Sequence, residues 1–136
     1  MKLELHNRIA LFFTRKARLG RMFKRRGGVS EQTSATIRRW IVSMGWTEDA
    51  SLQEVADSLG LYKEDFSLFF RRVYGKNFLQ WRKEIRIDEA KRLLVKDKTI
   101  PTAIIGEEVG ISDKSNFKRQ FREITGCTPA QWRSKH

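Results

Sequence analysis

The sequence predicts an all-α fold of about seven helices, with two helix-turn-helix subdomains joined by a long shared helix and preceded by a basic N-terminal arm. Three observations support this prediction. A stretch in the C-terminal half repeats an earlier stretch, apolar residues recur at helical spacing in both copies, and no segment after residue 6 alternates as a strand would. Proline, which interrupts helices, occurs only twice in 136 residues.

The repeat relates residues 55–82 to residues 105–133. With an offset of fifty, the first copy's Val55, Ala56, Leu59, Gly60 and Leu61 fall on Ile105, Gly106, Val109, Gly110 and Ile111. With an offset of fifty-one, Phe66, Phe70, Arg71, Gly75, Trp81 and Arg82 fall on Phe117, Phe121, Arg122, Gly126, Trp132 and Arg133. The one-residue slip follows the first matched glycine pair, where a turn would absorb it. Two copies of one supersecondary unit are the economical interpretation.

Each copy has the pattern of a helix, a tight turn and a second helix. Gly110 stands where the first helix must end, at a position that favours positive φ. Ser112 and Asp113 can cap the second helix, and Gly126 followed by Thr128-Pro129 can end it. A helix-turn-helix places its second helix in the DNA major groove. A plain helical hairpin is the alternative for one copy, and the presence of two copies favours the DNA-binding unit.

Residues 1–28 are predicted to form a basic arm or linker. They hold nine Lys and Arg residues against Glu4, a net charge of +8 out of +12 for the whole chain. Their apolar residues recur at near-helical spacing, so the arm could be a solvated tail, an auxiliary DNA contact, or a helix that docks on a membrane or a protein. Gly27-Gly28 would then serve as a hinge before the DNA-binding domain, 29–136.

The first subdomain is predicted to span 29–77. A helix from about Ser34 to Met44, ended by Gly45, carries Trp40 on its core face. A turn follows, and Ser51 is a good N-cap for the next helix. The core residues of the two helices that follow are expected to be Leu52, Val55, Ala56 and Leu59, and then Phe66, Phe70 and Val73.

The second helix of this first copy would present Lys63, Glu64, Ser67, Leu68 and Arg71 outward. Glu64, Ser67 and Leu68 are candidates for base contacts, since an acid can accept from cytosine and an apolar side chain can meet a thymine methyl. Lys63 and Arg71 are candidates for phosphate contacts. The alternative for the acids is that they are ordinary first-turn residues favoured by the helix dipole. Either way, this helix should supply little affinity.

Residues 78–95 are predicted to form the connecting helix, whose apolar residues serve both cores. Its 18 residues would span about 27 Å, while major-groove faces on one side of DNA lie about 34 Å apart. One chain could therefore read two neighbouring grooves. Trp81 in this helix, like Trp132 near the C-terminus, is expected to be buried, with an indole N–H that needs a partner.

The second subdomain is predicted to span 96–136, with Pro101 in its first helical turn. The recognition helix would start at Lys114 and face outward with Lys114, Ser115, Lys118, Arg119 and Arg122. Arg119 is the strongest candidate for reading a base, because a guanidinium can pair with guanine O6 and N7. Lys114, Ser115 and Lys118 are further candidates for base contacts. Arg122 and Ser112 are candidates for phosphate contacts, and a solvated basic face is the alternative for all of them.

Three motifs resemble the DNA-binding domain of the AraC/XylS family of bacterial transcription regulators, over about Ser51 to Arg133. They are R-I-x-x-A-x-x-L-L from Arg86, V-G-I-S-x-x-S-x-F-x-R-x-F from Val109, and G-x-T-P-x-x-W-R from Gly126. The family usually has Ala at position 106. Because glycine is a poorer helix former, Gly106 would weaken that helix slightly. The resemblance implies promoter binding, and often activation through contact with RNA polymerase. It also implies that abundance, or a sensor outside this chain, sets the activity.

The composition argues against several other classes of protein. No stretch approaches the roughly 18 apolar residues of a membrane span, so a membrane partner is not expected. Cys127 is the single cysteine, which argues against a disulfide or a cysteine metal site and fits a cytoplasmic location. No catalytic constellation can be assembled, so an enzyme, a cofactor and a small-molecule substrate are not expected. Double-stranded DNA is the expected partner, RNA polymerase is a further candidate, and the chain is expected to be a monomer or weak dimer.

Two rival functions stay open. The chain could be a DNA-binding fragment of a larger sensor regulator, in which case the arm would be dispensable. It could instead be a protein-interaction module, because residues 29–79 carry six basic and seven acidic residues, a net charge of −1, whereas 80–136 carry thirteen and eight, a net charge of +5. The second subdomain is therefore expected to supply more of the attraction to DNA.

Overall fold

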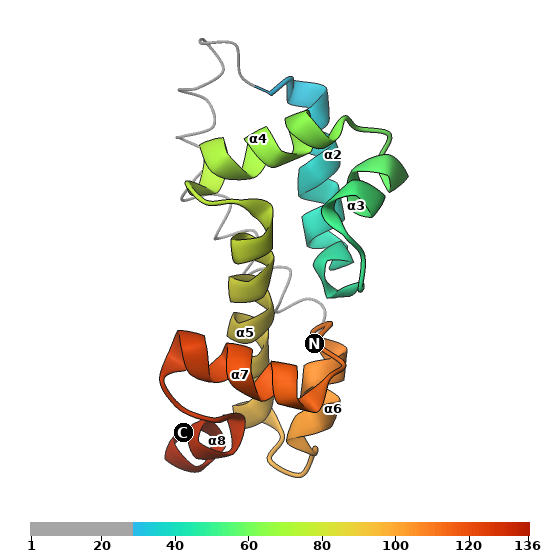
Figure 1. Ribbon diagram of the computed structural model, residues 1–136. Helices are drawn as coiled ribbons and strands as arrows, with labels where there is room; N and C mark the ends of the chain where they lie inside the picture. Colours follow the sequence, from blue (N-terminus) through green and yellow to red (C-terminus); the bar gives the residue numbers. More distant parts are fainter. Residues whose placement is uncertain (1–28) are drawn as a thin grey trace. The chain divides into compact units, whose positions relative to one another are not determined.

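A computed structural model describes residues 29–136 (Figure 1), and the predicted arm, 1–28, lies outside the described residues. All regular structure within 29–136 is helical, so the predicted all-α fold is confirmed. None of these helices is long and apolar enough to cross a membrane. The helices are α2 (Glu31–Val42), the 3-10 helix η2 (Gly45–Thr47), α3 (Leu52–Ser58), α4 (Lys63–Tyr74), α5 (Phe78–Lys96), α6 (Thr102–Glu108), α7 (Lys114–Thr125) and α8 (Pro129–Lys135).

The described residues fall into two compact units. The first takes 29–45 and 50–81, and the second takes 46–49 and 82–136. Helix α5 runs without interruption through both. The short segment 46–49 belongs to the second unit although it precedes the first helix-turn-helix in the chain, an arrangement that no sequence pattern predicted.

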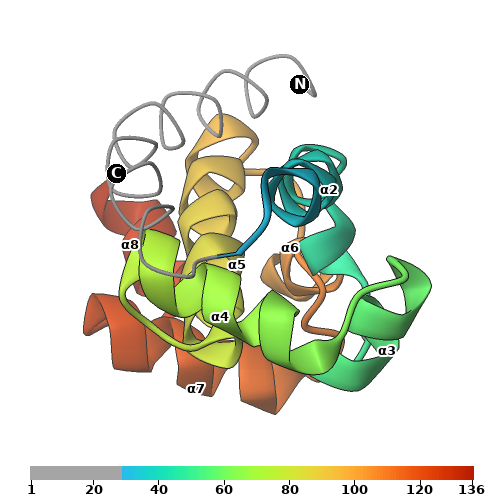
Figure 2. The same cartoon turned by 90° about the horizontal axis from the view of Figure 1, so that it is seen from above.

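Helix α2 differs from the predicted helix at both ends. It begins at Glu31 because Ser30 caps it, its hydroxyl accepting a hydrogen bond from the backbone N–H of Thr33 at 3.1 Å. It ends at Val42, and the left-handed conformation after it belongs to Met44, with φ of 66°, rather than to Gly45. Helix α4 packs across α2, and Figure 2 shows α2 nearly end-on where α4 lies across the view.

An aromatic core fills the first unit. Phe66, Phe70 and Trp81 are almost fully buried, and the Phe70 and Trp81 ring centroids lie 4.7 Å apart. Trp40, also predicted as core, is half-buried and packs edge-on against Phe66 with ring centroids 5.7 Å apart. Val55 and Ala56 of α3 are buried, whereas Leu52, Leu59 and Val73, also predicted as core, are half-buried. Phe69 and Tyr74, which were not among the predicted core residues, are also buried.

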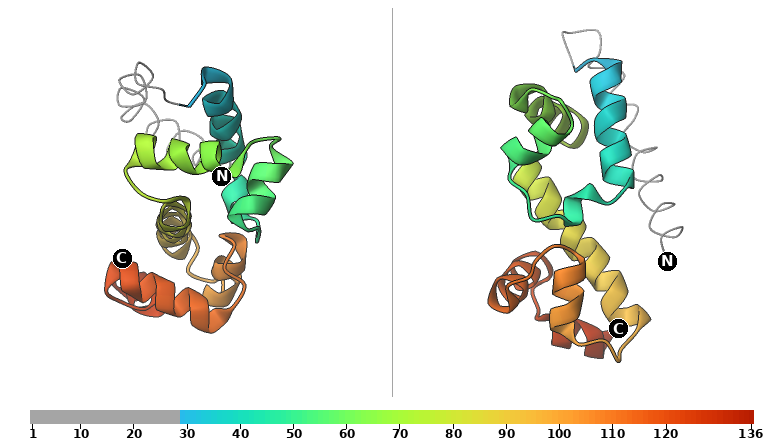
Figure 3. Two further views of the ribbon diagram at one scale, coloured as in Figure 1. Left: turned by 45° about the horizontal axis from the view of Figure 1, so that its top comes forward. Right: turned by 90° about the vertical axis from the view of Figure 1, so that its right-hand side faces the viewer.

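The second unit has its own apolar core, to which α5, α6 and α7 contribute. Figure 3 (right) shows α7 nearly end-on beside α6, against which it packs. The buried core residues are Ile87, Ala90, Leu93, Leu94, Ile105, Val109, Ile111, Phe117 and Phe121, with Ile100, Ile124 and Trp132 packed against them. Pro101 stands immediately before α6 rather than in its first turn.

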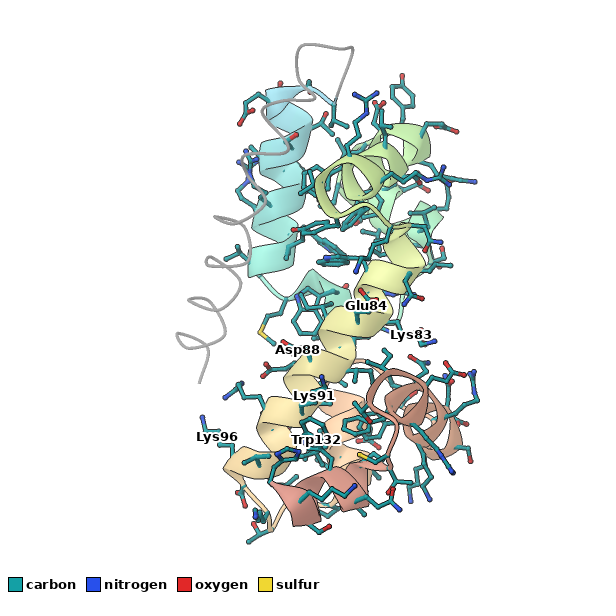
Figure 4. The ribbon with its side chains drawn as sticks, turned by 90° about the vertical axis from the view of Figure 1, so that its left-hand side faces the viewer. Lys83, Glu84, Asp88, Lys91, Lys96 and Trp132 are labelled. Carbon is teal, nitrogen blue, oxygen red and sulfur yellow. The ribbon has the colours of Figure 1, made fainter. Side chains whose placement is uncertain are left out.

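The two predicted tryptophans differ from expectation in their hydrogen bonding. Trp81 is buried, but Trp132 is half-buried, and neither indole Nε1 has a hydrogen-bond partner within residues 29–136. Ring contacts surround them instead. The Trp132 centroid lies 4.1 Å from that of His136, and the Lys91 ammonium lies 5.2 Å from it (Figure 4). Cation–π attraction is thus one interaction that holds this indole in place.

Candidate nucleic-acid interface

Helix α7 begins at Lys114, as predicted. Asp113 supplies its cap, because its carboxylate accepts from the backbone N–H of Asn116 at 2.7 Å. Ser112, the other predicted cap, is exposed and makes no such bond. Phe117 and Phe121 lie on the buried face, so Lys118 and Arg119 between them point outward. Gly126 ends α7 in the left-handed conformation, with φ of 82°.

One exposed face of α7 carries the residues that the sequence analysis selected in the second copy. Their spacing places Ser115, Lys118, Arg119 and Arg122 on the side away from the two buried phenylalanines, whereas Lys114, three residues before Phe117, is exposed as the first residue of the helix. Each of them is exposed, and four carry a positive charge: Lys114, Ser115, Lys118, Arg119 and Arg122. A basic helix face of this kind, with its apolar side locked in a core, is a surface that can approach a polyanion.

The guanidinium of Arg119 is held by neighbours on its own helix. Nη2 donates to Asn116 Oδ1 at 2.6 Å, and Nη1 donates to Glu123 Oε1 at 3.1 Å. Lys83, from α5, reaches the other oxygen of the same carboxylate, with Nζ to Oε2 at 2.5 Å. The hydrogen bond from Lys83 is the largest cause that lowers the pKa of Glu123, and the positive charges of Lys83 and Arg119 lower it further. Glu123 is therefore ionised at neutral pH.

Helix α4 presents its selected residues in the same register as α7, but with different chemistry. Lys63, Glu64 and Arg71 are exposed, whereas Ser67 and Leu68 are half-buried. Leu68 occupies the position that Arg119 has in α7. Since the face carries an acid near its start and an apolar side chain at its centre, it offers a polyanion less than α7 does.

Tyr62 is a surface residue that the sequence analysis missed. It stands at the N-cap of α4 but makes no side-chain cap bond, and it is 79% exposed. The repeat could have revealed it, because the offset of fifty-one places Tyr62 opposite Asp113, the residue that caps α7. The two copies therefore differ in the residue that precedes the second helix, an exposed aromatic ring in one and a capping carboxylate in the other.

A buried arginine supports the turn that precedes α7. Arg86 on α5 donates from Nε to the Trp46 carbonyl at 2.7 Å and from Nη2 to the Glu48 carbonyl at 2.9 Å. Burial lowers the pKa of Arg86 to about 10, so it stays cationic at neutral pH. The segment that it holds lies against Gly110, since a Cβ at Gly110 would be 2.4 Å from the Thr47 carbonyl oxygen. Arg86 thereby helps to position the helix-turn-helix from outside it.

Gly106, expected to weaken its helix slightly, also lies at a close contact between helices. A Cβ at this position would lie 2.9 Å from Cγ of Phe117 and 3.0 Å from the backbone oxygen of Ile111. Helix α6 can therefore approach α7 this closely only with glycine at the contact.

Comparison with known proteins agrees with this geometry. Residues 55–135 match the family model described as "Helix-turn-helix domain". The arabinose operon regulatory protein of Salmonella typhimurium is 35% identical over 83 residues, which are 61% of this chain and 29% of that protein. This chain thus spans less than a third of the length of that relative.

Solved structures share the fold. The C-terminal domain of AraT, a response regulator from Geobacillus stearothermophilus, matches with a TM-score of 0.69 and 24% identity, over 79% of this chain and 88% of that one. The DNA-binding domain of AdpA, solved in complex with a target DNA, matches with a TM-score of 0.66 and 21% identity, over 78% of this chain and 93% of that one. With a family match that covers more than half of its residues, the chain belongs to the AraC-type helix-turn-helix family of DNA-binding transcription regulators.

Proposed function

We propose that this chain binds double-stranded DNA sequence-specifically and regulates transcription. The observation that carries the proposal is the exposed surface of α7, with three cations opposite a buried apolar side and Lys114 at the start of the helix. Basic residues attract the phosphate backbone, and a helix of this width fits the major groove. Family membership supports the same activity.

Within α7, we assign base contacts to Arg119, Lys118, Ser115 and Lys114. Arg119 is placed first because its guanidinium offers paired donors to guanine O6 and N7. Arg122, a turn further along, is assigned to phosphate, together with Ser112 before the helix. Phosphate contacts set the register of the helix on the duplex, while base contacts select the sequence.

Helix α4 is proposed to enter the neighbouring major groove and to contribute less affinity. Its candidate base contacts are Glu64, Ser67 and Leu68, and its candidate phosphate contacts are Lys63 and Arg71. Tyr62 joins them as a candidate contact at the start of the helix, since its exposed ring and hydroxyl can meet a sugar, a phosphate or a thymine methyl. The continuity of α5 through both units supports a single chain that reads two half-sites.

The wider role follows from the proposed DNA binding. The chain would act as an activator through contact with RNA polymerase, in the cytoplasm, as a monomer or weak dimer and without enzymatic activity. The basic arm, 1–28, would accompany 29–136 as an accessory element, and 29–77, 78–95 and 96–136 would serve as first subdomain, connecting helix and second subdomain. A signal that controls the chain could come from a sensor outside it.

A protein-interaction module is the second candidate function. Helix α4 supports it, because Glu64 and Asp65 are both exposed in its first turn and would face a polyanion unfavourably. In that case α4 would dock on a partner protein, and α7 would bind DNA weakly with no preferred sequence.

Selection of bound sequences from a random duplex library tests the proposal, at about 150 mM salt, where non-specific attraction is screened. The full chain and a version that begins at Val29 would be compared. We expect both to enrich one site with two sequence blocks about one helical turn apart. Enrichment of a single block would make α4 a docking surface, and no enrichment would favour the protein-interaction module.

A further inference from the structure

The single acidic residue of α7 lies among its cations. Glu123 has one carboxylate oxygen 3.1 Å from Nη1 of Arg119 and the other 2.5 Å from Nζ of Lys83. An unpaired carboxylate on a helix face that approaches phosphates would oppose binding. Here each oxygen is occupied by a different cation, and the cations come from two helices, α7 and α5.

The guanidinium of Arg119 is anchored at both ends. While Glu123 holds Nη1, Asn116 accepts from Nη2 at 2.6 Å, and Gln120 donates to the same Asn116 oxygen at 3.0 Å. The backbone N–H of Asn116 is in turn bound by the capping Asp113. Two of the five guanidinium donor hydrogens are engaged, so three stay available to a ligand. A side chain held in this way loses less conformational entropy when it binds.

The same carboxylate also pairs with Lys83, so the Lys83 ammonium is not an unpaired cation that DNA phosphates could attract. Its side chain is 27% exposed, and it leaves α5 on the side where α7 lies (Figure 4). While Glu123 neutralises it, Lys83 has less to offer a phosphate. The hydrogen bond from Lys83 lowers the pKa of Glu123, so the carboxylate is ionised throughout the neutral range.

The arrangement has no counterpart in the first unit. At the offset of fifty-one, Leu68 stands for Arg119, Arg72 for Glu123 and Asp65 for Asn116. The repeated fold therefore does not need these contacts. Surface ion pairs of this exposure also contribute little to stability. A function in recognition explains them better than a function in folding.

We propose that Glu123 is a specificity-determining positioning residue, which orients Arg119 toward a base and neutralises Lys83 so that Lys83 adds little affinity for unrelated DNA. This inference rests on the proposed function. It adds to that function a residue that contacts no base and yet sets the balance between selected and random sequences.

The test measures binding of the full chain to its selected duplex, to duplexes substituted at each base pair, and to a random duplex, over a range of salt. The variants are Glu123→Gln, Arg119→Ala, the two combined, and Glu123→Gln with Lys83→Met. Glu107→Gln is the matched control, because Glu107 is exposed and its side chain makes no hydrogen bond or ion pair within 29–136. Thermal melts monitor folding, and we expect them to be nearly unchanged.

We expect Glu123→Gln to reduce the preference at the base pair that Arg119 reads by at least about fivefold. In the Arg119→Ala background it should reduce that preference no further, because Glu123 acts through Arg119. On the random duplex, Glu123→Gln should steepen the salt dependence by about one unit of log K per log salt as Lys83 is released. Lys83→Met should cancel this change, and Glu107→Gln should produce neither effect.

An unchanged base preference in Glu123→Gln would overturn the orienting role, and an unchanged salt slope would overturn the neutralising role. Either result would leave the proposed function standing, because the wild-type chain would still select a sequence. A wild-type chain that selects no sequence would instead remove the proposed function and this inference together.

Discussion

A Cβ on Gly110 would lie 2.4 Å from the backbone carbonyl oxygen of Thr47. Gly110 ends the first helix of the second helix-turn-helix with φ of 97°, so glycine is favoured there by the backbone conformation as well as by the close approach. The segment that contains Thr47 comes from before the first helix-turn-helix, yet it belongs to the second unit. The turn before the recognition helix is therefore built from two distant parts of the chain.

Gly110→Ala should lower the free energy of unfolding more than a positive φ alone would. The left-handed backbone costs about 1–2 kcal/mol for alanine, and the contact with Thr47 should add about 1–3 kcal/mol. Gly126→Ala is the matched control, since Gly126 has φ of 82° and nothing within 4 Å of its Cβ position. Urea denaturation measures both variants. Equal losses would mean that the close approach to Thr47 carries no energetic weight.

Arg86→Met should destabilise the second unit by about 2–4 kcal/mol, because the Trp46 and Glu48 carbonyls would lose their charged donor. Arg86→Lys should recover only part of this loss, because an ammonium cannot reproduce the planar fork of donors. Lys98→Met, at an exposed position, controls for loss of charge. Urea denaturation followed by Trp fluorescence is the measurement, and a full recovery by lysine would contradict the proposed geometry.

Gly106→Ala should destabilise the protein although alanine is the better helix former by about 1 kcal/mol. The added methyl would meet the Phe117 ring at 2.9 Å, and overpacking of this kind costs about 1–3 kcal/mol. Thermal unfolding would measure the change. Combination with Phe117→Leu should cost less than the sum of the two single changes. A stabilised Gly106→Ala variant would show that α6 and α7 can separate at no cost.

Arg119→Ala should weaken binding to the selected duplex by about 1–3 kcal/mol and relax the preference at one base pair. Leu68→Ala, at the matching position of α4, should change binding much less, because the side chain is half-buried and uncharged. Titration of fluorescent duplexes measures both. A loss for Arg119→Ala that is equal on random DNA would identify Arg119 as a phosphate contact, and a large site-specific loss for Leu68→Ala would assign a base to α4.

Local features of this protein could be predicted because they depend on residues close together in the chain. Ser51 caps α3 because its hydroxyl accepts a hydrogen bond from the Glu54 backbone N–H at 3.2 Å, as its position before an apolar periodic stretch predicted. Gly110 and Gly126 adopt the positive φ expected where a helix ends. The buried face of α7 followed from the four-residue spacing of Phe117 and Phe121. The start of α2 differs from the prediction because Ser30, two residues after the Gly27-Gly28 pair, caps the helix.

The sequence by itself determined the all-α class, the duplicated unit and the face of α7 that stays exposed, since period and turn chemistry act within a few residues. Only the tertiary structure decided that 46–49 joins the second unit, that Arg86 holds this segment, and that Gly106 is required by Phe117. It also decided that Lys83 meets Glu123, forty residues away. These contacts depend on how helices pack, and no spacing in the chain encodes which side chains packing brings together.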